Sequence, residues 1–387
     1  MEIKNRIQII DVLRGLSILS IAVIHFVEQF NLGAWPQSES IVLKTLNNLS
    51  FNTIWFFFAS KSFGVFAFMF GVSYHIIINN ERLKGKNGQL KYLWRMFLLL
   101  IIGLIHASLY NGDILTLLAI VGLFIPLFNK CSNKLLIGIS LVFLLQLPFI
   151  IYAICSSEMQ GWNEIAKYTN SMWEGFWEAG TGASLISLLK YNAIEGQIGK
   201  IGWWLQQHRV SQILGLALLG IVSARVNFWS NIKIHFKKIS FVFVISVITY
   251  FVIREVNRVL PYDIFKENGY WYVKSIIESY INILLTFAFI TSVILLYFHT
   301  KLIGILNYMG SVGRLSLTAY VLQPIVGQWL FYGYGLSFYK IIGQFYCAVL
   351  GFIFAILLTV ILNLYGKRFR YGPIEYIWRK ATNIIKI

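Results

Sequence analysis

The chain has 387 residues, of which 57% are hydrophobic and only 13% are charged. Soluble domains carry about 25% charged residues, so this composition excludes a water-soluble fold. The net charge of +17 comes from basic residues scattered between apolar runs, which is typical of cytoplasmic loops facing anionic lipid. We therefore expect membrane lipids as partners and no nucleic acid.

The apolar runs predict an all-α fold, a polytopic transmembrane bundle of about ten spans that forms a single membrane domain over residues 1–387. The stretch 301–312 is too short to cross and is expected to be interfacial or re-entrant. The expected spans are 12–30, 54–78, 93–110, 113–129, 135–155, 202–223, 239–254, 276–298, 315–332 and 342–364.

Charge counts predict that both termini are cytoplasmic. In that orientation 21 Lys and Arg residues fall in inner segments and nine in outer ones, as the positive-inside rule requires. The long segment 156–201 is then external. Its five Glu and three Trp predict an amphipathic helix on the outer surface. Two interpretations of this segment stay open: a lid over an external mouth, or a loop resting on lipid headgroups.

The first span contains two ionisable residues, Arg14 and His25. Ionisable groups inside spans are costly and usually face a bundle interior or a cavity. Eleven residues correspond to about three turns, so both side chains share one face, roughly 16 Å apart. Asp11 is placed to pair with Arg14. An Arg suits a phosphate group and a His suits proton abstraction, whereas a positive anchor and a packing residue are the structural alternatives.

Further polar residues follow in the next spans. Lys61 is expected to face a polar interior, beside Gly64 and Gly71, which let a neighbouring helix approach closely. His106 precedes an Asn-Gly turn that leads to Asp113 at the start of the next helix. Asp113 is interpreted either as a helix cap or, with His106, as part of an external polar site that includes His25 and Lys61.

Two later segments are also rich in polar groups. His208, Arg209 and Gln212 lie along one side of the span 202–223, which predicts a wet cavity open toward the exterior. The span 315–332 and its preceding residue supply Arg314 and Gln323. The three cysteines are too far apart to indicate a disulfide framework, and they do not indicate a metal site. A cationic inner face with a His-containing outer half suits a phosphorylated donor inside and a polar acceptor outside, and would equally suit a transporter.

Several motifs resemble known membrane proteins. Residues 11–16, DVLRGL, resemble the DxLRG start of membrane acyltransferase families. A larger set resembles, nearly end to end, the YeiB-type family of bacterial integral membrane proteins of largely undefined activity. This set comprises KSFGVFAFMFG at 61–71, GLIHASLYNGDIL at 103–115, SLTAYVLQPIVGQWLFYGYGL at 316–336 and RYGPIEYIWR at 370–379.

That family is similar to a wider superfamily of transmembrane acyltransferases, which includes surface polysaccharide O-acetyltransferases and heparan glucosaminide N-acetyltransferase. The resemblance implies acyl-CoA, such as acetyl-CoA, as donor substrate and no metal. The O-acetyltransferases carry Arg and His separated by ten residues in the first span, a spacing that Arg14 and His25 match. The implied roles are donor binding by Arg14, Asp11 and Arg314, catalysis by His25, His106 and Asp113, and acceptor binding by Lys61, His208, Arg209 and Gln323.

The predicted function is transfer of an acyl group from cytosolic acyl-CoA to an acceptor at the outer side of a bacterial plasma membrane. The acceptor would be a hydroxyl or amine on a glycan, a lipid-linked sugar or a small polar metabolite, and a homodimer is considered. A non-enzymatic transporter or immunity-type membrane protein is the rival hypothesis. A structural membrane protein with no cavity chemistry is a third.

Overall fold

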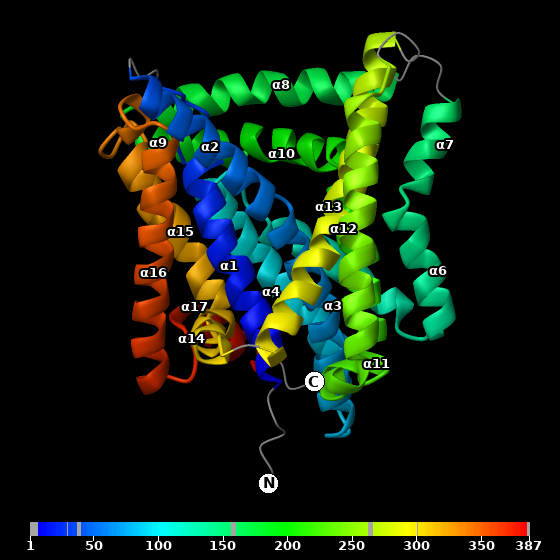
Figure 1. The fold of residues 1–387 in the computed structure, drawn as a ribbon. Helices are drawn as coiled ribbons and strands as arrows, with labels where there is room; N and C mark the ends of the chain where they lie inside the picture. The colour runs from blue at the N-terminus through cyan, green and yellow to red at the C-terminus, as the bar shows by residue number, and fades with distance from the viewer. Residues whose placement is uncertain are drawn as a thin grey trace.

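A computed structural model describes residues 7–28, 30–36, 40–155, 160–261, 266–299 and 301–384, and every regular element in these ranges is a helix. Most of the long helices run side by side as an upright bundle, while α8 (Gln160–Thr181) and α10 (Glu195–Gln206) lie across one end (Figure 1). Helix α1 (Gln8–Glu28) begins, and α17 (Pro373–Thr382) lies, at the opposite end. The predicted all-α bundle is confirmed.

Six helical segments of the described chain are long and apolar enough to cross a membrane, or seven if one bent pair counts as a single span. The protein is therefore a helical membrane protein. The count of ten spans and the cytoplasmic termini stay predictions. The candidate segments are α1, α2–α3 (Ile41–Phe58 and Lys61–Arg82), α4 (Gly88–Leu109), α12 (Phe236–Arg258), α13 (Lys266–His299), α16 (Gln344–Arg368) and the bent pair α6–α7 (Asn133–Leu144 and Leu147–Cys155).

The remaining helices are shorter. The stretch expected to be interfacial forms α14, a 12-residue helix that contacts α1. The others are α5 (Leu115–Phe124), α9 (Leu185–Ala193), α11 (Arg209–Arg225), α14 (Ile303–Arg314) and α15 (Ser316–Phe331), with 3₁₀ helices η1 (Ile125–Phe128), η2 (Phe228–Ser230), η3 (Ile232–His235) and η4 (Phe338–Lys340).

Helix α1 is the central element of the bundle. Of its most apolar stretch, 89% is buried inside the protein, against 17% for α12, whose apolar side chains are left to face lipid. A Cβ atom at Gly15 would collide with the carbonyl oxygen of Met309, and one at Gly313 with that of Asp11. Helices α1 and α14 thus pack backbone against backbone, as small residues allow in membranes. The residues of α1 are therefore fixed from most sides.

Three spans that we expected to be continuous are broken, which corrects the sequence prediction. The interruptions fall at Ser60 between α2 and α3, at Gln146 between α6 and α7, and at His208 between α10 and α11. All three residues have φ between 53° and 63°, a left-handed conformation that is uncommon outside glycine. Each break lets a polar side chain reach a buried hydrogen-bond partner: Ser60 bonds Arg209, Gln146 bonds Ser279, and His208 bonds Ser275.

Candidate functional site

A cavity of 1190 Å³ lies beneath the helices that cross the end of the bundle. Residues of α8 and α10, among them Thr169, Met172, Lys200 and Trp203, line one part of its wall. The rest comes from α1, α2, α3, α11, α12, α13 and α15, from the break between α2 and α3, and from the turn at 110–114. Four residues predicted from the sequence line it together: His25, Lys61, Asp113 and Arg209. The segment expected to lie outside therefore covers a polar chamber, although its assignment to the exterior stays a prediction.

Two histidines from different helices, His25 and His106, pack against the same two tyrosines, and of the two only His25 lines the cavity. The ring of Tyr110 lies 5.0 Å from that of His25 and 6.0 Å from that of His106, centroid to centroid. Tyr320 lies 5.0 Å from His106 and 6.2 Å from His25. His25 Nδ1 and the Tyr110 hydroxyl are buried and have no hydrogen-bond partner among the described residues. Buried polar atoms are rarely left without a partner, so this cluster is a candidate for ligand contact.

Asp113 orients His106. Its Oδ1 atom lies 2.8 Å from His106 Nδ1 and accepts from the Leu115 amide at 3.0 Å. Its Oδ2 atom accepts from the Thr116 amide at 2.9 Å and the Thr116 hydroxyl at 2.5 Å. The carboxylate thus caps α5 and holds His106 at once, so both interpretations of Asp113 describe real contacts. His106 Nε2 is buried without a partner in the described chain and is the ring atom left to exchange a proton.

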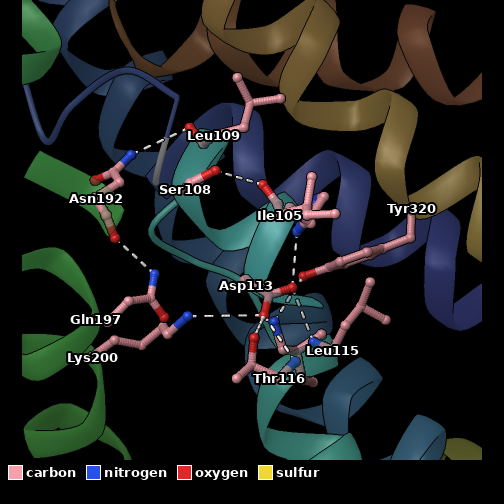
Figure 2. A network of polar contacts seen from close by, with 12 residues as sticks. Ile105, Ser108, Leu109, Asp113, Leu115, Thr116, Asn192, Gln197, Lys200 and Tyr320 are labelled. Atoms are coloured by element: carbon pink, nitrogen blue, oxygen red, sulfur yellow. Dashed lines mark hydrogen bonds and ion pairs between the residues drawn. The ribbon is translucent and has the colours of Figure 1, made fainter. Parts of the chain in front are cut away.

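Lys200 connects the crossing helices to this cluster. Its Nζ atom lies 3.8 Å from Asp113 Oδ2 (Figure 2). The same atom lies 5.2 Å from the ring of Trp204. Burial lowers the pKa of Lys200 to about 8, although the Asp113 carboxylate acts to raise it. Sequence analysis did not select Lys200. The available signal was its spacing from Trp203 and Trp204, three and four residues on, which puts the amine and both indoles on one helix face.

Two amide side chains tie the same helices to the hairpin between α4 and α5. Asn192 Nδ2 donates to the Leu109 carbonyl oxygen at 3.3 Å, and Gln197 Nε2 donates to the Asn192 carbonyl oxygen at 2.8 Å (Figure 2). Gln328 of α15 donates to the same Leu109 oxygen at 2.7 Å. The Leu109 carbonyl oxygen at the end of α4 therefore accepts two hydrogen bonds. These bonds connect α9 and α15 to the hairpin that carries His106 and Asp113.

Lys61 and Arg209 are two buried cations in the cavity wall, each 6% exposed. Arg209 donates from Nη2 to Ser60 Oγ at 2.8 Å and from Nη1 to Gln212 Oε1 at 3.1 Å, as the predicted shared side of α11 requires. Lys61 Nζ donates to the Trp55 carbonyl oxygen at 3.1 Å. Within the described ranges no carboxylate lies within 4.0 Å of either cation.

A buried polar network runs from Arg209 to the break between α6 and α7. Gln212 Nε2 donates to Ser279 Oγ at 2.8 Å, and Gln146 Nε2 donates to the same oxygen at 2.8 Å. His208 takes part from outside the cavity, because its Nε2 lies 2.9 Å from Ser275 Oγ and its ring packs 4.4 Å from that of Phe149. His208 does not line the cavity, in contrast to its expected acceptor role.

The residues predicted to bind the donor lie at the other end of α1. Arg14 pairs with Asp11 at 3.8 Å, as expected, and its Nη2 donates to the Ser73 hydroxyl. Arg314 is exposed at the end of α14. None of these residues lines the cavity, and Arg14 lies about 16 Å along α1 from His25.

Gln323 lies between the two ends, with its Nε2 donating to the Ile18 carbonyl oxygen of α1 at 3.2 Å. It is fully buried and does not line the cavity, so an acceptor role for it stays a prediction. Among the described residues no group of three or more His, Cys, Asp or Glu is arranged to hold a metal ion.

Comparison with known proteins places the chain among membrane proteins without an assigned activity. Residues 223–385 match the family described as "Protein of unknown function (DUF418)". The chain is 25% identical to the uncharacterized protein YeiB of Escherichia coli, over 83% of this chain and 81% of YeiB. The chain resembles YeiB over most of its length. This confirms the family resemblance, whereas membership of the acyltransferase superfamily stays a prediction.

Another relative is similar to this chain over almost its whole length. The uncharacterized protein YxaH of Bacillus subtilis is 27% identical over 98% of this chain and 94% of its own. An uncharacterized 39.9 kDa protein of Bacillus acidopullulyticus is 24% identical over 43% of this chain. No solved structure is significantly similar. The DUF418 match begins at residue 223, so the cavity residues His25, Asp113, Lys200 and Arg209 lie outside it.

Proposed function

We propose that this protein transfers an acyl group from cytosolic acyl-CoA, such as acetyl-CoA, to a hydroxyl or amine of a polar acceptor bound in the cavity. The acceptor would be a cell-surface glycan, a lipid-linked sugar or a small metabolite, and the membrane would be the bacterial plasma membrane. The observation that carries the proposal is the pairing of His106 with Asp113 near a second histidine, His25, where Asp113 and His25 both line a large cavity.

The paired residues supply what acyl transfer needs. Asp113 fixes the His106 tautomer, so Nε2 is basic and aimed away from the carboxylate. In the proposed step a histidine takes the proton of the acceptor hydroxyl, the oxygen attacks the thioester carbonyl carbon, and the C–S bond breaks. The thiolate leaves with the proton that the histidine took. His25 lines the cavity and is the histidine closer to a bound acceptor, with His106 behind it.

The cavity wall suits a polar, ring-shaped acceptor. Trp55, Trp173, Trp203 and Tyr250 line it together with charged groups, and aromatic faces pack well against the C–H faces of sugar rings. Oriented charges and hydrogen-bonding groups then fix the position of the reacting hydroxyl. A purely packed bundle would leave no such chamber, so the structural-protein hypothesis has the least support.

Donor binding requires a path along α1. The cavity reaches His25 but not Arg14, and the two residues are about 16 Å apart on the helix. In the proposal Arg14 holds a phosphate of CoA at the terminal end, and the acyl arm passes between α1 and α3, where Arg14 contacts Ser73. The contact between these helices must therefore loosen when the donor binds.

A second candidate, a transporter of polar solutes, is favoured by the one-sided shape of the cavity. The chamber lies at the roofed end, whereas at the other end α1 packs backbone to backbone on α14. Broken helices around a polar site are also common in secondary transporters. A transporter would move its solute without consuming acetyl-CoA, which separates the two functions.

The test uses the purified full-length protein in liposomes. Acetyl-CoA labelled in the acetyl group is added with an extract of cell-envelope glycans and lipids, and free CoA thiol and labelled product are measured. The proposal expects binding of acetyl-CoA that weakens in Arg14→Ala, and turnover that is lost in His25→Ala. Absence of acetyl-CoA binding to the wild-type protein would remove the enzyme hypothesis, and unchanged turnover in His25→Ala would remove His25 as the base.

A further inference from the structure

The first turns of α3 and α11 meet in the cavity wall. Lys61 is the first residue of α3 and Arg209 the first of α11, and the Arg209 guanidinium bonds the hydroxyl of Ser60, the residue before α3. Neither helix has a side chain that caps its first turn, and neither has an acidic residue there. Their first amide groups therefore have no protein anion to face, and each helix end carries a positive dipole.

The two helices run in the same direction, because their first turns meet at the Arg209–Ser60 hydrogen bond and the helices touch again further along each one, so their dipoles add at this point. A Cβ atom at Gly71 of α3 would collide with the Ala217 carbonyl oxygen of α11, and one at Gly220 of α11 with the Phe68 carbonyl oxygen of α3. These contacts fall about ten residues after each N-terminus, roughly 15 Å along each axis. Equal distances from the crossing put the two N-termini at one level, on the cavity.

Among the residues that the structure describes, the two cations at these N-termini have only neutral direct partners. Arg209 bonds a hydroxyl and an amide oxygen, and its guanidinium lies 5.0 Å from the ring of Phe63 and 5.3 Å from that of Trp203. Glu28 and Glu278 line the same cavity, but neither lies within 4.0 Å of Arg209. Two cations that are each 94% buried and lack a carboxylate at contact distance are costly unless an anion completes the site.

We infer that the joined N-termini of α3 and α11 form an oxyanion-binding site, in which Arg209 and Lys61 hold a phosphate or carboxylate group of the cavity ligand. The guanidinium fork binds two oxygens, the Lys61 ammonium binds a third, and further amides of the two first turns complete the contacts. The inference rests on the proposed function for the role of the ligand, because it assigns the acyl acceptor to the class of anionic compounds: a phosphorylated or acidic sugar, or a phospholipid headgroup.

Thermal unfolding of the full-length protein in nanodiscs tests this without turnover. Inorganic phosphate is titrated into the wild type, and sodium chloride at equal ionic strength is the reference. We expect a saturable rise in Tm with phosphate alone, and at least a tenfold weaker apparent affinity in Arg209→Gln. Arg254→Gln is the matched control, because Arg254 also lines the cavity but is exposed on α12, and its affinity should stay within twofold of the wild type.

Further variants and lipids sharpen the result. Arg209→Lys, which keeps the charge and loses the fork, should fall between wild type and Arg209→Gln, and it serves if the glutamine variant does not fold. The lipid of the nanodisc separates two sources of the anion. If phosphate raises Tm in phosphatidylcholine but not in phosphatidylglycerol, the site binds a lipid headgroup. If the rise in Tm is equal in both lipids, the site binds a soluble phosphate. Equal affinity in wild type and Arg209→Gln, or an equal effect of chloride, overturns the inference. Phosphate binding without acetyl transfer would instead contradict the proposed function alone.

Discussion

The two ends of α1 carry ionisable residues in opposite circumstances. Near the N-terminus of α1, Arg14 has a carboxylate and a hydroxyl as partners, and the backbones of α1 and α14 touch. At the other end His25 borders a cavity, with a buried nitrogen that has no partner in the described chain. One helix therefore presents a satisfied charge at one end and an unsatisfied base at the other.

This difference indicates which end carries the chemistry. Buried polar groups that already have hydrogen-bond partners gain little free energy from a ligand. Buried polar groups without partners are stabilised when a ligand supplies the missing hydrogen bond. His25, Lys200 and Arg209 line the roofed cavity, and His106 is paired with Asp113 of its wall. Among the described residues, His25 Nδ1 and His106 Nε2 have no hydrogen-bond partner, Arg209 bonds only neutral groups, and the Lys200 amine lies 3.8 Å from the Asp113 carboxylate. We therefore assign acceptor binding and proton transfer to the cavity end, and only donor anchoring to the Arg14 end.

The largest expected effect comes from Asp113→Asn. The change removes the partner of His106 and of Lys200 while keeping the size of the side chain. We expect acetyl transfer to fall by roughly 10²–10⁴-fold, because the histidine loses its oriented tautomer. The control is Glu81→Gln, a buried acid with lysine partners at 2.9 and 3.2 Å at the end of α3 away from the cavity. Equal losses in both variants would contradict the comparison.

The packing between α3 and α11 supports the cavity wall, and Gly71→Ala tests it. The new methyl group would meet the Ala217 carbonyl oxygen, so we expect a loss of about 3 kcal/mol or more in the free energy of unfolding, or no folded protein. Gly138→Ala on α6 meets nothing within 4 Å and should stabilise by up to about 1 kcal/mol. Melting in detergent measures both, and a neutral Gly71→Ala would show that the helices are not in backbone contact.

Lys200 predicts a pH dependence of stability. Its pKa in the folded protein, about 8, lies below the value of 10.5 for the exposed amine, so the folded protein releases this proton first. Between about pH 8 and 10.5 the unfolded chain binds more protons, and the free energy of unfolding rises with pH by at most about 3 kcal/mol. Lys200→Gln should lack this rise. If the difference in Tm between the wild type and Lys200→Gln does not increase from about pH 7.5 to 9.5, Lys200 is not a buried amine with a lowered pKa.

The smallest effect on catalysis is expected at Arg14, near the N-terminus of α1. Arg14→Gln removes the anchor for a donor phosphate but no reacting group, so the KM for acetyl-CoA should rise about tenfold with kcat nearly unchanged. Steady-state rates at several acetyl-CoA concentrations separate the two constants. A large fall in kcat would place Arg14 in the chemistry and abolish the distinction between the two ends.

Much of the helical arrangement can be predicted from the sequence, and the features that cannot be predicted depend on long-range contacts. Apolar length predicts the helices, and helical spacing predicts the Arg14–Asp11 pair and the alignment of Arg209 with Gln212. The breaks at Ser60 and His208 are not predictable from local signals, because neither carries Gly or Pro and long-range hydrogen bonds determine them. Gln146 had a signal, since Pro148 follows two residues later.

The site is divided in the same way. Of the four residues that their depth in the spans groups together, His25, Lys61 and Asp113 line the cavity and His106 contacts Asp113. Their grouping is readable in the sequence because burial of charge is costly wherever the helices pack. Lys200 was missed because α10 crosses the end of the bundle instead of continuing a span, which only the tertiary structure shows.

The central claim is that the reacting base lies at the cavity end, and kcat of His25→Gln at saturating acetyl-CoA tests it most directly. The cavity account predicts a fall of at least 100-fold in kcat, with acetyl-CoA bound as tightly as by the wild type. A kcat within threefold of the wild-type value would contradict the account.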